Sequence, residues 1–598
     1  MNKVTKRLAA LRELMKKNSV DAYIIPTDDF HSSEYVGAYF KTREFMSGFT
    51  GSAGTLVVMS DRALLWTDGR YFIQAEAELS GSGIKLMKSG QEGVPKISEF
   101  LKENLADGST VGFDGRTVSI DFADKLEKNL ADKNVSYNYD LDLAGDVWTD
   151  RPELSSEPVW EMPVSYVGER RCDKLSRIRE KMKAEEADIF LVSALDEIAW
   201  TLNLRGNDIP CNPVFLSYML IFHDKGLLYV NEKILSEEII KDLSDDGVYI
   251  RPYNDIYRDL KEMQVGQIIL YDGKVTNYKL KMSIPNRQKT VDKTSPIELM
   301  KAVKNPTEYE NEKLAHIKDG VAVTRFIYWL KNEADKLTTT EISAAAKLEE
   351  FRQQEEGYLG PSFDTIAAYG PHGAIVHYEP TEETNISLKP ESFLLVDSGG
   401  QYMEGTTDIT RTITLGPLTE EEKKAYTLVL MGHLNLAAAK FLYGTRGENL
   451  DYVAREPLWR YGMDFNHGTG HGVGYFLNVH EGPNRIHFKI TDDRPHSAIF
   501  EEGMITSDEP GLYIEGKFGI RHENLLLCRK GEKNEYGQFM YFENLTWVPF
   551  DREAIDTSLM SDREIKLLND YHEQVYEKIS PFLNDEESVW LRDVTTKI

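Results

Sequence analysis

Apolar positions at the start of the chain recur with the spacing of a helix. Leu8, Leu11 and Leu14/Met15 fall on one helical face between charged residues, and the apolar run 23–25 follows after a short break. An apolar stripe at intervals of three and four residues predicts an amphipathic helix, and a short apolar run predicts a buried strand. We therefore expect the chain to open with a helix followed by a strand.

The same succession recurs further along the chain. The segment KLSRIREKMK at 174–183 matches RLAALRELMK at 7–16, and the apolar run 188–192 matches 21–25. The segments GFTGSAGTLVV and LLWTDGRYF are then echoed by NLRGNDIPCNPVF and LLYVN. Because helix, strand, glycine loop and second strand recur in one order, we predict two related α/β domains, residues 1–157 and 158–303.

The pattern changes after this repeat. Thr307 and Glu310 have the spacing of a capping box, which predicts a helix, and a second helix is expected near Thr338. The first helix should carry an apolar stripe at Leu314, Ile317, Val321 and Leu330. After Phe351 short apolar runs alternate with glycine turns, which predicts strands. We predict one further domain over residues 304–540.

The last residues, 541–598, are expected to form a C-terminal extension. Ser561 and Glu564 fit another helix cap, and apolar residues follow at helical spacing. These residues are Ile565, Leu568, Tyr571, Val575 and Ile579. Such a stripe is typical of a helix that packs on a core or at a dimer interface.

Length and charge restrict the class of protein. A chain of 598 residues exceeds what one hydrophobic core supports, which agrees with several domains. Lys and Arg number 70 against 98 Asp and Glu, so the formal charge is −28. This balance disfavours a nucleic-acid partner, because its phosphates would be repelled.

Cysteine content and hydropathy indicate a compartment. The three cysteines, Cys172, Cys211 and Cys528, stand far apart without a CxxC motif, which suits a reducing environment. No apolar run reaches the roughly eighteen residues that a membrane span needs, and the N-terminus lacks the apolar core of a signal peptide. We expect a cytoplasmic protein without a membrane partner.

Two aspartates follow the first strand pattern of the third domain. In FLLVDSGGQYMEGTTDITRTITL, residues 393–396 and 409–415 are strand-like, so a long β-hairpin is predicted. Asp397 ends the first strand and Asp408 begins the second, and we expect them to face each other across the pair. Two such carboxylates repel unless a cation lies between them. The alternative is that both cap turns at the surface.

A glycine-rich segment, NHGTGHGVGYFLNVHEGP, gathers histidines. The glycines between His467 and His471 exclude the helical HExxH zinc motif, and the run fits neither GxGxxG nor a phosphate loop. Glycine instead allows the backbone to come close to a bound group. His480 adds a third imidazole and His377, in GAIVHYEP, a fourth. A lone histidine is usually structural, but this concentration favours a functional site.

Two glutamates complete the candidate set. Glu509 precedes Pro-Gly in ITSDEPGLYI, and Glu523 enters the strand-like stretch FGIRHENLLL. A carboxylate in an apolar strand needs a partner, which is either a metal ion or Arg521. The pooled candidates are Asp397, Asp408, His471, Glu509 and Glu523. Four carboxylates and one imidazole suit two divalent transition-metal ions, which together generate hydroxide at neutral pH and polarise a carbonyl.

The order Asp, Asp, His, Glu, Glu resembles that of the pita-bread metallopeptidases. The motifs HGTGHGVGYFLNVHEGP, DSGGQYMEGTTDITRT and SDEPGLY…GIRHEN are similar to those of the three-domain, cytosolic-type aminopeptidase P family. FTGSAGT, LWTDGRYF and the C-terminal extension extend the resemblance over nearly the whole chain. The implied fold is two creatinase-like N-terminal α/β domains followed by an α+β pita-bread catalytic domain.

The resemblance also implies an activity. The chain would be a proline-specific metalloaminopeptidase, a hydrolase that removes the residue in front of proline from peptides with proline at the second position. Its cofactors would be two divalent ions, Mn²⁺ first, with Zn²⁺ or Co²⁺ as alternatives. The family pattern makes the five pooled residues the metal ligands and Glu509 the proton acceptor for the attacking water. A homodimer is expected from the same resemblance.

Further residues take roles from the family pattern. His377 and His480 match catalytic, substrate-contacting imidazoles that stabilise the oxyanion and deliver a proton to the leaving nitrogen. His467 matches a residue near the prolyl ring. Tyr513 and Arg521 match positions that orient metal ligands, and Arg70 matches a substrate-contacting arginine supplied by the first domain.

Other activities remain compatible with this sequence. A prolidase-like dipeptidase would use the same metal centre, and a metal-free relative would be a peptide-binding module or a creatine-type hydrolase. The intact ligand set argues against the metal-free alternatives. The aromatic neighbours Tyr475 and Phe476 either contact the proline ring or pack in the core.

Overall fold

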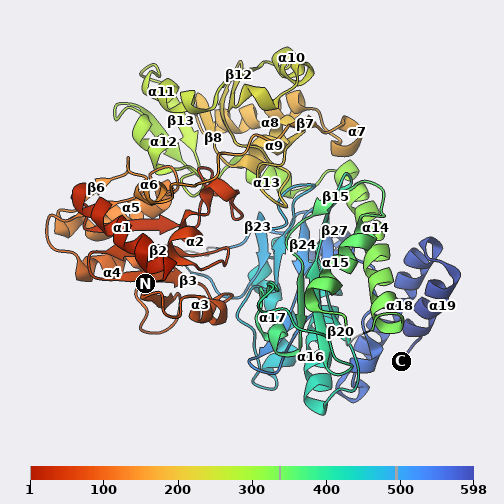
Figure 1. Ribbon diagram of the computed structural model, residues 1–598. Coiled ribbons are helices and arrows are strands. Elements are labelled where there is room, and N and C mark those ends of the chain that lie inside the picture. Colours follow the sequence, from red (N-terminus) through yellow and green to blue (C-terminus); the bar gives the residue numbers. More distant parts are fainter. Residues whose placement is uncertain (1, 336–337, 492–495) are drawn as a thin grey trace. The chain divides into compact units, whose positions relative to one another are not determined.

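The computed structural model describes residues 2–335, 338–491 and 496–598. The chain folds into two compact units, Met1–Pro163 with Glu169–Ile297 and Val164–Gly168 with Glu298–Ile598 (Figure 1). None of the helices in the described residues combines the length and apolar content that a bilayer span requires.

The first unit opens with the predicted helix and strand. Helix α1 (Lys3–Lys17) buries Leu8, Leu11 and Met15, as its apolar stripe predicts, and the Asn2 side chain accepts a hydrogen bond from the Thr5 backbone at its start. The first sheet has the strand order β4-β3-β2-β1-β5-β6. Its strands are β1 (Ala22–Pro26), β2 (Thr55–Met59), β3 (Ala63–Thr67), β4 (Ile84–Lys88), β5 (Thr110–Gly112) and β6 (Ser136–Asn138). The other helices of this half are α2 (Thr42–Ser47), α3 (Phe72–Glu78), α4 (Ile97–Asn104), α5 (Ile120–Leu130) and α6 (Leu143–Val147).

The second half of this unit repeats the arrangement. Helix α8 (Arg171–Ala184) leads into β8 (Ile189–Val192), and the sheet order is β12-β11-β10-β8-β13-β14. In both sheets the strand after the opening helix takes the fourth place, so the predicted repeat is confirmed in its topology. The remaining strands are β7 (Trp160–Glu161), β9 (Leu204–Arg205), β10 (Ser217–Phe222), β11 (Gly226–Val230), β12 (Val248–Pro252), β13 (Ile268–Tyr271) and β14 (Lys289–Asp292). The remaining helices are α9 (Leu195–Leu202), α10 (Glu237–Asp245), α11 (Ile256–Lys261) and α12 (Tyr278–Ser283).

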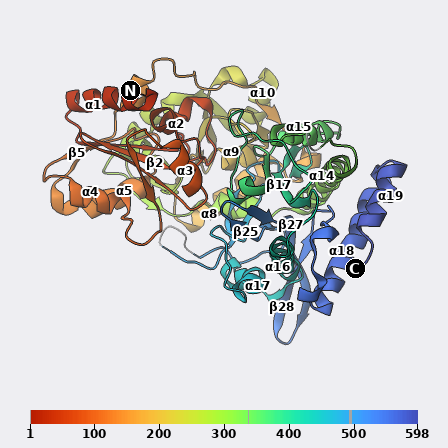
Figure 2. The same cartoon turned by 60° about the horizontal axis from the view of Figure 1, so that its bottom comes forward.

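The second unit also contains helices. They are α7 (Val164–Val167), α13 (Pro296–Ala302), α14 (Pro306–Asn332), α15 (Glu341–Arg352), α16 (Glu420–Ala437), α17 (Gly447–Trp459), α18 (Asp562–Ile579) and α19 (Asp585–Val594). The core between α16 and α18 contains Tyr426, Leu430, Leu568 and Val575. Figures 1 and 2 show α18 and α19 side by side at the end of the chain.

Two predicted helix starts are wrong by two residues. Helix α14 is capped by Asn305 and Glu308, not by Thr307 and Glu310, because Pro306 occupies the first turn, where its missing N–H costs nothing. Helix α15 is capped by Thr340, not by Thr338. The cap of α18 by Ser561 and Glu564 is confirmed.

The predicted apolar stripe of α14 is also partly wrong. Val321 and Leu330 are buried, but Leu314 is 54% exposed. The buried side of this helix instead carries polar groups such as Glu312, His316 and Asp319, which approach the strands near Asp408. A stripe defined by apolar residues alone therefore misses part of the buried face.

The sheets of the second unit are antiparallel. Their orders are β15-β18-β19, β16-β17-β20, β21-β28-β27-β24-β22-β23 and β25-β26. The first two sheets contain β15 (Tyr358–Pro361), β16 (Ile366–Tyr369), β17 (Phe393–Ser398), β18 (Gly400–Tyr402), β19 (Gly405–Thr406) and β20 (Ile409–Thr414). The others contain β21 (Lys440–Leu442), β22 (Gly470–Gly472), β23 (Glu481–Ile486), β24 (Ile505–Asp508), β25 (Gly511–Ile514), β26 (Phe518–Arg521), β27 (Asn524–Asn534) and β28 (Gly537–Asn544).

Candidate active site

Strand pairing brings the two aspartates together with an offset. Strands β17 and β20 pair antiparallel, as predicted, but Asp397 lies opposite Thr410 and Ser398 opposite Ile409. Asp408 precedes β20 and is therefore displaced along the pair from Asp397. The predicted direct opposition is wrong, because the residues between the strands do not form a simple turn. They form β18 and β19, which belong to another sheet.

The two glutamates meet at the end of a second strand pair. Asp508 in β24 lies opposite Asn524 in β27, so Glu509 and Glu523 are the next residues outward on the two strands. Glu523 lies between β26 and β27 and not inside one continuous strand. Strand β22 pairs with β24 through Gly472 and Thr506, which adds His471 to the same region.

One glycine is required for this approach. A Cβ atom at Gly470 would lie 1.9 Å from the carbonyl oxygen of Ser507, so any side chain there would separate β22 from β24. The backbone N–H of His471 then donates a hydrogen bond of 2.9 Å to the Ser507 hydroxyl. The glycines around His471 thus serve close packing of strands.

Asp397, Asp408, His471, Glu509 and Glu523, together called the acidic cluster, fit metal binding. Asp408, His471 and Glu523 each offer a ligand atom within 4.8 Å of the others. The His471 Nε2 atom lies 3.5 Å from Asp408 Oδ2 and 3.3 Å from Glu509 Oε1. Two buried oxygens, Asp397 Oδ1 and Glu523 Oε1, have no hydrogen-bond partner among the described residues. Such oxygens are what a bound cation satisfies.

The pKa values of the cluster indicate excess negative charge. Burial raises the pKa of Glu523 well above its ordinary value, and the carboxylates of Asp408, Glu509 and Asp397 raise it further. Burial also raises the pKa of Asp397 and of Glu509. Burial alone would lower the pKa of His471, but Asp408 and Glu509 raise it to about 9. Divalent cations would relieve this repulsion in place of protons.

Arg521 supports the cluster, although not as the partner of the glutamates. Its Nη2 donates to Asp397 Oδ2 at 2.6 Å, and its Nη1 donates to the Tyr513 hydroxyl at 2.7 Å. Its Nε lies 3.3 Å from the Thr410 hydroxyl, which in turn donates to Glu523 Oε2 at 2.7 Å. The ion pair of Arg521 is therefore formed with Asp397, and not with Glu523 as the sequence had suggested as an alternative.

Sequence reasoning missed several supporting residues. Ser507 donates to Glu509 Oε1 at 3.1 Å while it accepts from the His471 backbone, and Thr410 holds Glu523 as described. The buried Arg455 donates to the carbonyl oxygen of His467 at 2.8 Å and forms an ion pair with Asp451. Ser507 and Thr410 stand inside the recognised motifs, but Arg455 and Asp451 lie in α17 without a motif signal.

Two of the predicted imidazoles, His480 and His467, contact the cluster or a side chain that supports it. The ring of His480 lies 4.3 Å from that of His471, measured between centroids, and His467 Nε2 lies 2.8 Å from the Tyr513 hydroxyl. His377 is half-buried and follows the turn 370–374, which packs on β26. Tyr475 and Phe476 are buried, and the Tyr475 hydroxyl donates to the carbonyl of Tyr166, so both pack in the core.

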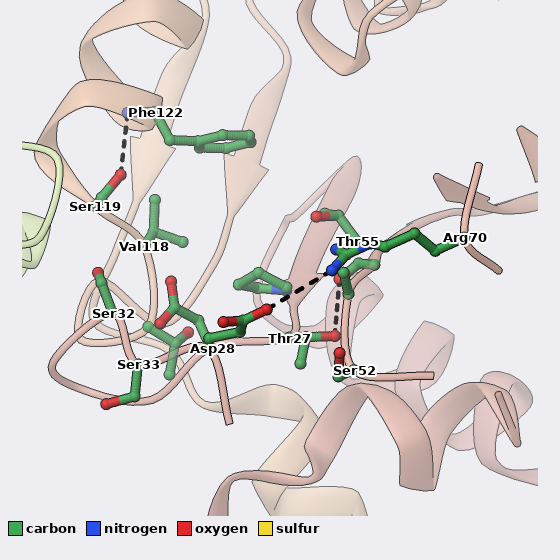
Figure 3. Close-up of a pocket in the computed structure, with 15 residues that line it drawn as sticks. Thr27, Asp28, Ser32, Ser33, Ser52, Thr55, Arg70, Val118, Ser119 and Phe122 are labelled. Carbon is green, nitrogen blue, oxygen red and sulfur yellow. Dashed lines mark hydrogen bonds and ion pairs between the residues drawn. The ribbon is translucent and has the colours of Figure 1, made fainter. Parts of the chain in front are cut away.

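Arg70 belongs to the first unit, where it lines a cavity of about 340 Å³. Figure 3 shows its guanidinium reaching in beside Thr55 and Ser52, with Asp28 and Ser33 further along the wall. Arg70 forms an ion pair with Asp68 at 2.8 Å, and both carboxylate oxygens of Asp68 accept its N–H groups. The side chain is therefore held in place within this unit.

Comparison with known families assigns every major segment of the chain. Residues 310–530 match metallopeptidase family M24, and residues 538–598 match the C-terminal region of that peptidase family. Residues 7–141 and 150–308 each match a creatinase/prolidase N-terminal domain. The same repeat is visible in the two six-stranded sheets of the first unit.

Full-length relatives decide the family. The chain is 42% identical to a probable Xaa-Pro aminopeptidase P of Talaromyces marneffei, over 99% of this chain and 92% of the relative. It is 40% identical to Xaa-Pro aminopeptidase 1 of Dictyostelium discoideum, over 99% and 96%. The chain belongs to the Xaa-Pro aminopeptidase family. The resemblance and the predicted enzyme class, a metalloaminopeptidase, are confirmed.

Solved structures extend this family assignment to the fold. The X-prolyl aminopeptidase of Caenorhabditis elegans, described as a cytosolic enzyme with a di-nuclear active site, superposes with a TM-score of 0.94 over 100% of both chains at 35% identity. The Xaa-Pro dipeptidase of Bacillus anthracis, 21% identical, matches 64% of this chain and 99% of its own with a TM-score of 0.51. The predicted fold, two creatinase-like N-terminal domains followed by a pita-bread domain, is confirmed.

Proposed function

We propose that this chain hydrolyses the N-terminal Xaa-Pro bond of peptides with two divalent ions held by the acidic cluster. The observation that carries the proposal is the close group of Asp408, His471 and Glu523. Beside it, two buried carboxylate oxygens, Asp397 Oδ1 and Glu523 Oε1, lack any partner among the described residues. The relatives named for Xaa-Pro cleavage and the di-nuclear site of the nematode enzyme support it.

The donor set suits Mn²⁺ first, with Zn²⁺ or Co²⁺ as alternatives. Oxygen donors dominate, one imidazole favours a transition metal over Ca²⁺, and no thiolate is present. When bound, two such ions make hydroxide available at neutral pH and polarise the scissile carbonyl. Asp397, Asp408, His471, Glu509 and Glu523 would hold them.

The chain's own residues handle the protons. Glu509 is the acceptor for the proton of the attacking water, since its pKa is raised by burial while Ser507 fixes one of its oxygens. His377 and His480 stabilise the developing oxyanion and deliver a proton to the leaving nitrogen. Arg521 and Tyr513 keep Asp397 oriented through the bonds described above.

Proline specificity follows from the chemistry of the bond. An Xaa-Pro bond is a tertiary amide without an N–H, so a site that accepts it must protonate a ring nitrogen and tolerate the ring. We assign His467, which is hydrogen-bonded to Tyr513, to the position beside the prolyl ring. We assign Arg70, from the first domain, as a substrate-contacting residue. We keep the domain division 1–157, 158–303, 304–540 and 541–598, a homodimer and a cytoplasmic location as further parts of the proposal.

Two measurements test the proposal together. Metal analysis should find two ions per chain, and chelation should abolish cleavage of an Arg-Pro-Pro peptide until Mn²⁺ is returned. Cleavage of Xaa-Pro-Xaa peptides and of Xaa-Pro dipeptides is then compared. If only the dipeptide is cut, the chain is a prolidase-like dipeptidase; if it binds no metal and cuts neither, the enzymatic proposal is wrong.

A further inference from the structure

A buried ionic bridge lies directly beside His480. The next residue, Glu481, binds two lysines: Lys301 Nζ donates to Oε2 at 2.7 Å, and Lys304 Nζ donates to Oε1. The three side chains are between 1% and 3% exposed. Each oxygen of one carboxylate thus has its own lysine, and all three charges are removed from water.

The lysines come from the segment that enters the second unit. Lys301 lies in the last turn of α13, and Lys304 follows it just before the cap of α14. This segment packs tightly on the strands of the site. A Cβ atom at Gly482 would lie 2.4 Å from Glu298 Oε1, and the backbone N–H of Lys304 donates to the Gly503 carbonyl at 3.0 Å. The segment therefore offers a fixed support for Glu481.

The bridge is connected to the acidic cluster through the backbone. Glu481 opens β23 and is paired with Gly472 of β22, the neighbour of His471. On the other side of His480, Leu477 is held at both backbone groups: its carbonyl accepts from Gln401 and its N–H donates to Thr406. His480 therefore lies between two residues whose positions are fixed by buried hydrogen bonds, Leu477 and Glu481. Glu481 is directly adjacent to it.

A contribution to the stability of the fold does not by itself explain this ionic bridge. Removing two ammonium groups and a carboxylate from water is expensive, and apolar side chains of similar size often serve a fold equally well. What an ionic bridge of this geometry provides is a fixed position, because both carboxylate oxygens are bound from defined directions.

We propose that Glu481, clamped by Lys301 and Lys304, is a positioning residue that fixes the His480 imidazole for proton transfer. The inference rests on the proposed function, in which His480 acts on the substrate. It adds Lys301 and Lys304 as supports of that imidazole, and both lysines lie outside the motifs that contain the metal ligands.

The test uses the full-length, Mn²⁺-loaded enzyme and an Arg-Pro-Pro peptide. We compare Glu481→Gln and Lys301→Met with Lys331→Met, which breaks the Lys331–Asp551 ion pair away from the site. Glu481→Gln should lower kcat roughly 10- to 100-fold and Lys301→Met about 10-fold, with KM and metal content unchanged. Lys331→Met should keep kcat within about 2-fold. Lys301→Met leaves Glu481 with one lysine, so it tests the clamp even if Glu481→Gln does not fold.

A double-mutant cycle with His480→Asn separates positioning from a general structural role. If Glu481 acts through His480, Glu481→Gln should lower kcat by less than about 3-fold when His480 is already replaced. Equal factors in both backgrounds, an unchanged kcat in both clamp variants, or a crystal structure of Lys301→Met with the His480 ring undisplaced would overturn the positioning role. If the wild type fails to cut the peptide, the proposed function itself has failed.

Discussion

Asp319 and the acidic cluster are both buried in the second unit, but their partners differ. Asp319 accepts from Arg352 at 2.6 and 3.1 Å, from Tyr402 and from Thr407, so both of its oxygens are bound. The cluster holds four carboxylates against Arg521 and leaves two buried oxygens without partners. The first arrangement satisfies its own charges, whereas the second leaves oxygens that the proposed cations would satisfy.

The pKa shifts express the same difference. Burial would lower the pKa of Arg352, yet Asp319 raises it above its usual value, as expected of a matched pair. In the cluster burial raises the pKa of Asp397, Glu509 and Glu523, and the carboxylates act on one another in the same direction. Unbalanced burial of like charge is typical of functional sites.

Removing a cluster carboxylate should have the largest effect. Asp408→Ala deletes one of the closest three ligands, and we expect activity on Arg-Pro-Pro to fall more than about 1,000-fold, with fewer than two ions bound per chain. Metal analysis and steady-state kinetics measure this. A variant that keeps two ions and most of its activity would contradict the ligand assignment.

Breaking the matched pair should affect the fold instead. Arg352→Met leaves Asp319 as a buried charge without its cation, so the free energy of unfolding should decrease by about 3 kcal/mol or more. Denaturant unfolding measures the loss. The exposed Arg460–Glu456 pair supplies the control, since Arg460→Met should cost less than about 1 kcal/mol. Equal losses would remove the contrast between buried and exposed pairs.

The pH dependence of metal stabilisation sharpens the comparison. Raised pKa values mean that the metal-free folded protein holds protons that the unfolded chain releases, so its stability falls as pH rises towards the His471 pKa of about 9. Bound metal displaces those protons. The gain in the free energy of unfolding on metal binding should therefore increase between about pH 6 and pH 9, by about 1.4 kcal/mol per pH unit for each proton displaced. The Tm difference between loaded and metal-free protein, measured across this range, follows that gain. A stabilisation by metal that does not change with pH would refute the displacement of protons by the metal.

The hydroxyl of Ser507 should have the smallest effect of the four. Ser507→Ala removes the bonds to Glu509 and to the His471 backbone, and we expect activity or metal affinity to fall about 10-fold. Ser497→Ala is a matched control, because that hydroxyl is bound to Glu448 and Gly447 outside the cluster. If both variants behave alike, Ser507 has no special role.

The sequence predicted which residues belong to the site better than it predicted how the strands that carry them pair. Residue types and motifs named Asp408, His471 and Glu523 as candidates, and the structure places a ligand atom of each within 4.8 Å of the others. The register of β17 against β20 was not predictable, since the residues between them join another sheet instead of forming a turn.

Fold prediction failed where local signals competed. Thr307 and Glu310 have the spacing of a cap, but α14 starts at Pro306 and Asn305 is its cap. The partner of Arg521 was missed for a related reason. Asp397 is distant in sequence, and the packing of β26 against β17 and β20 brings the two together.

The support of Glu481 has a consequence for dividing the protein. The match to metallopeptidase family M24 begins at residue 310, which would be a natural place to cut if the catalytic half were expressed alone. A fragment starting there lacks Lys301 and Lys304, so Glu481 would become a buried carboxylate without either ammonium group. The catalytic half is thus not self-sufficient at its apparent border, and a workable fragment must retain the helix that precedes it.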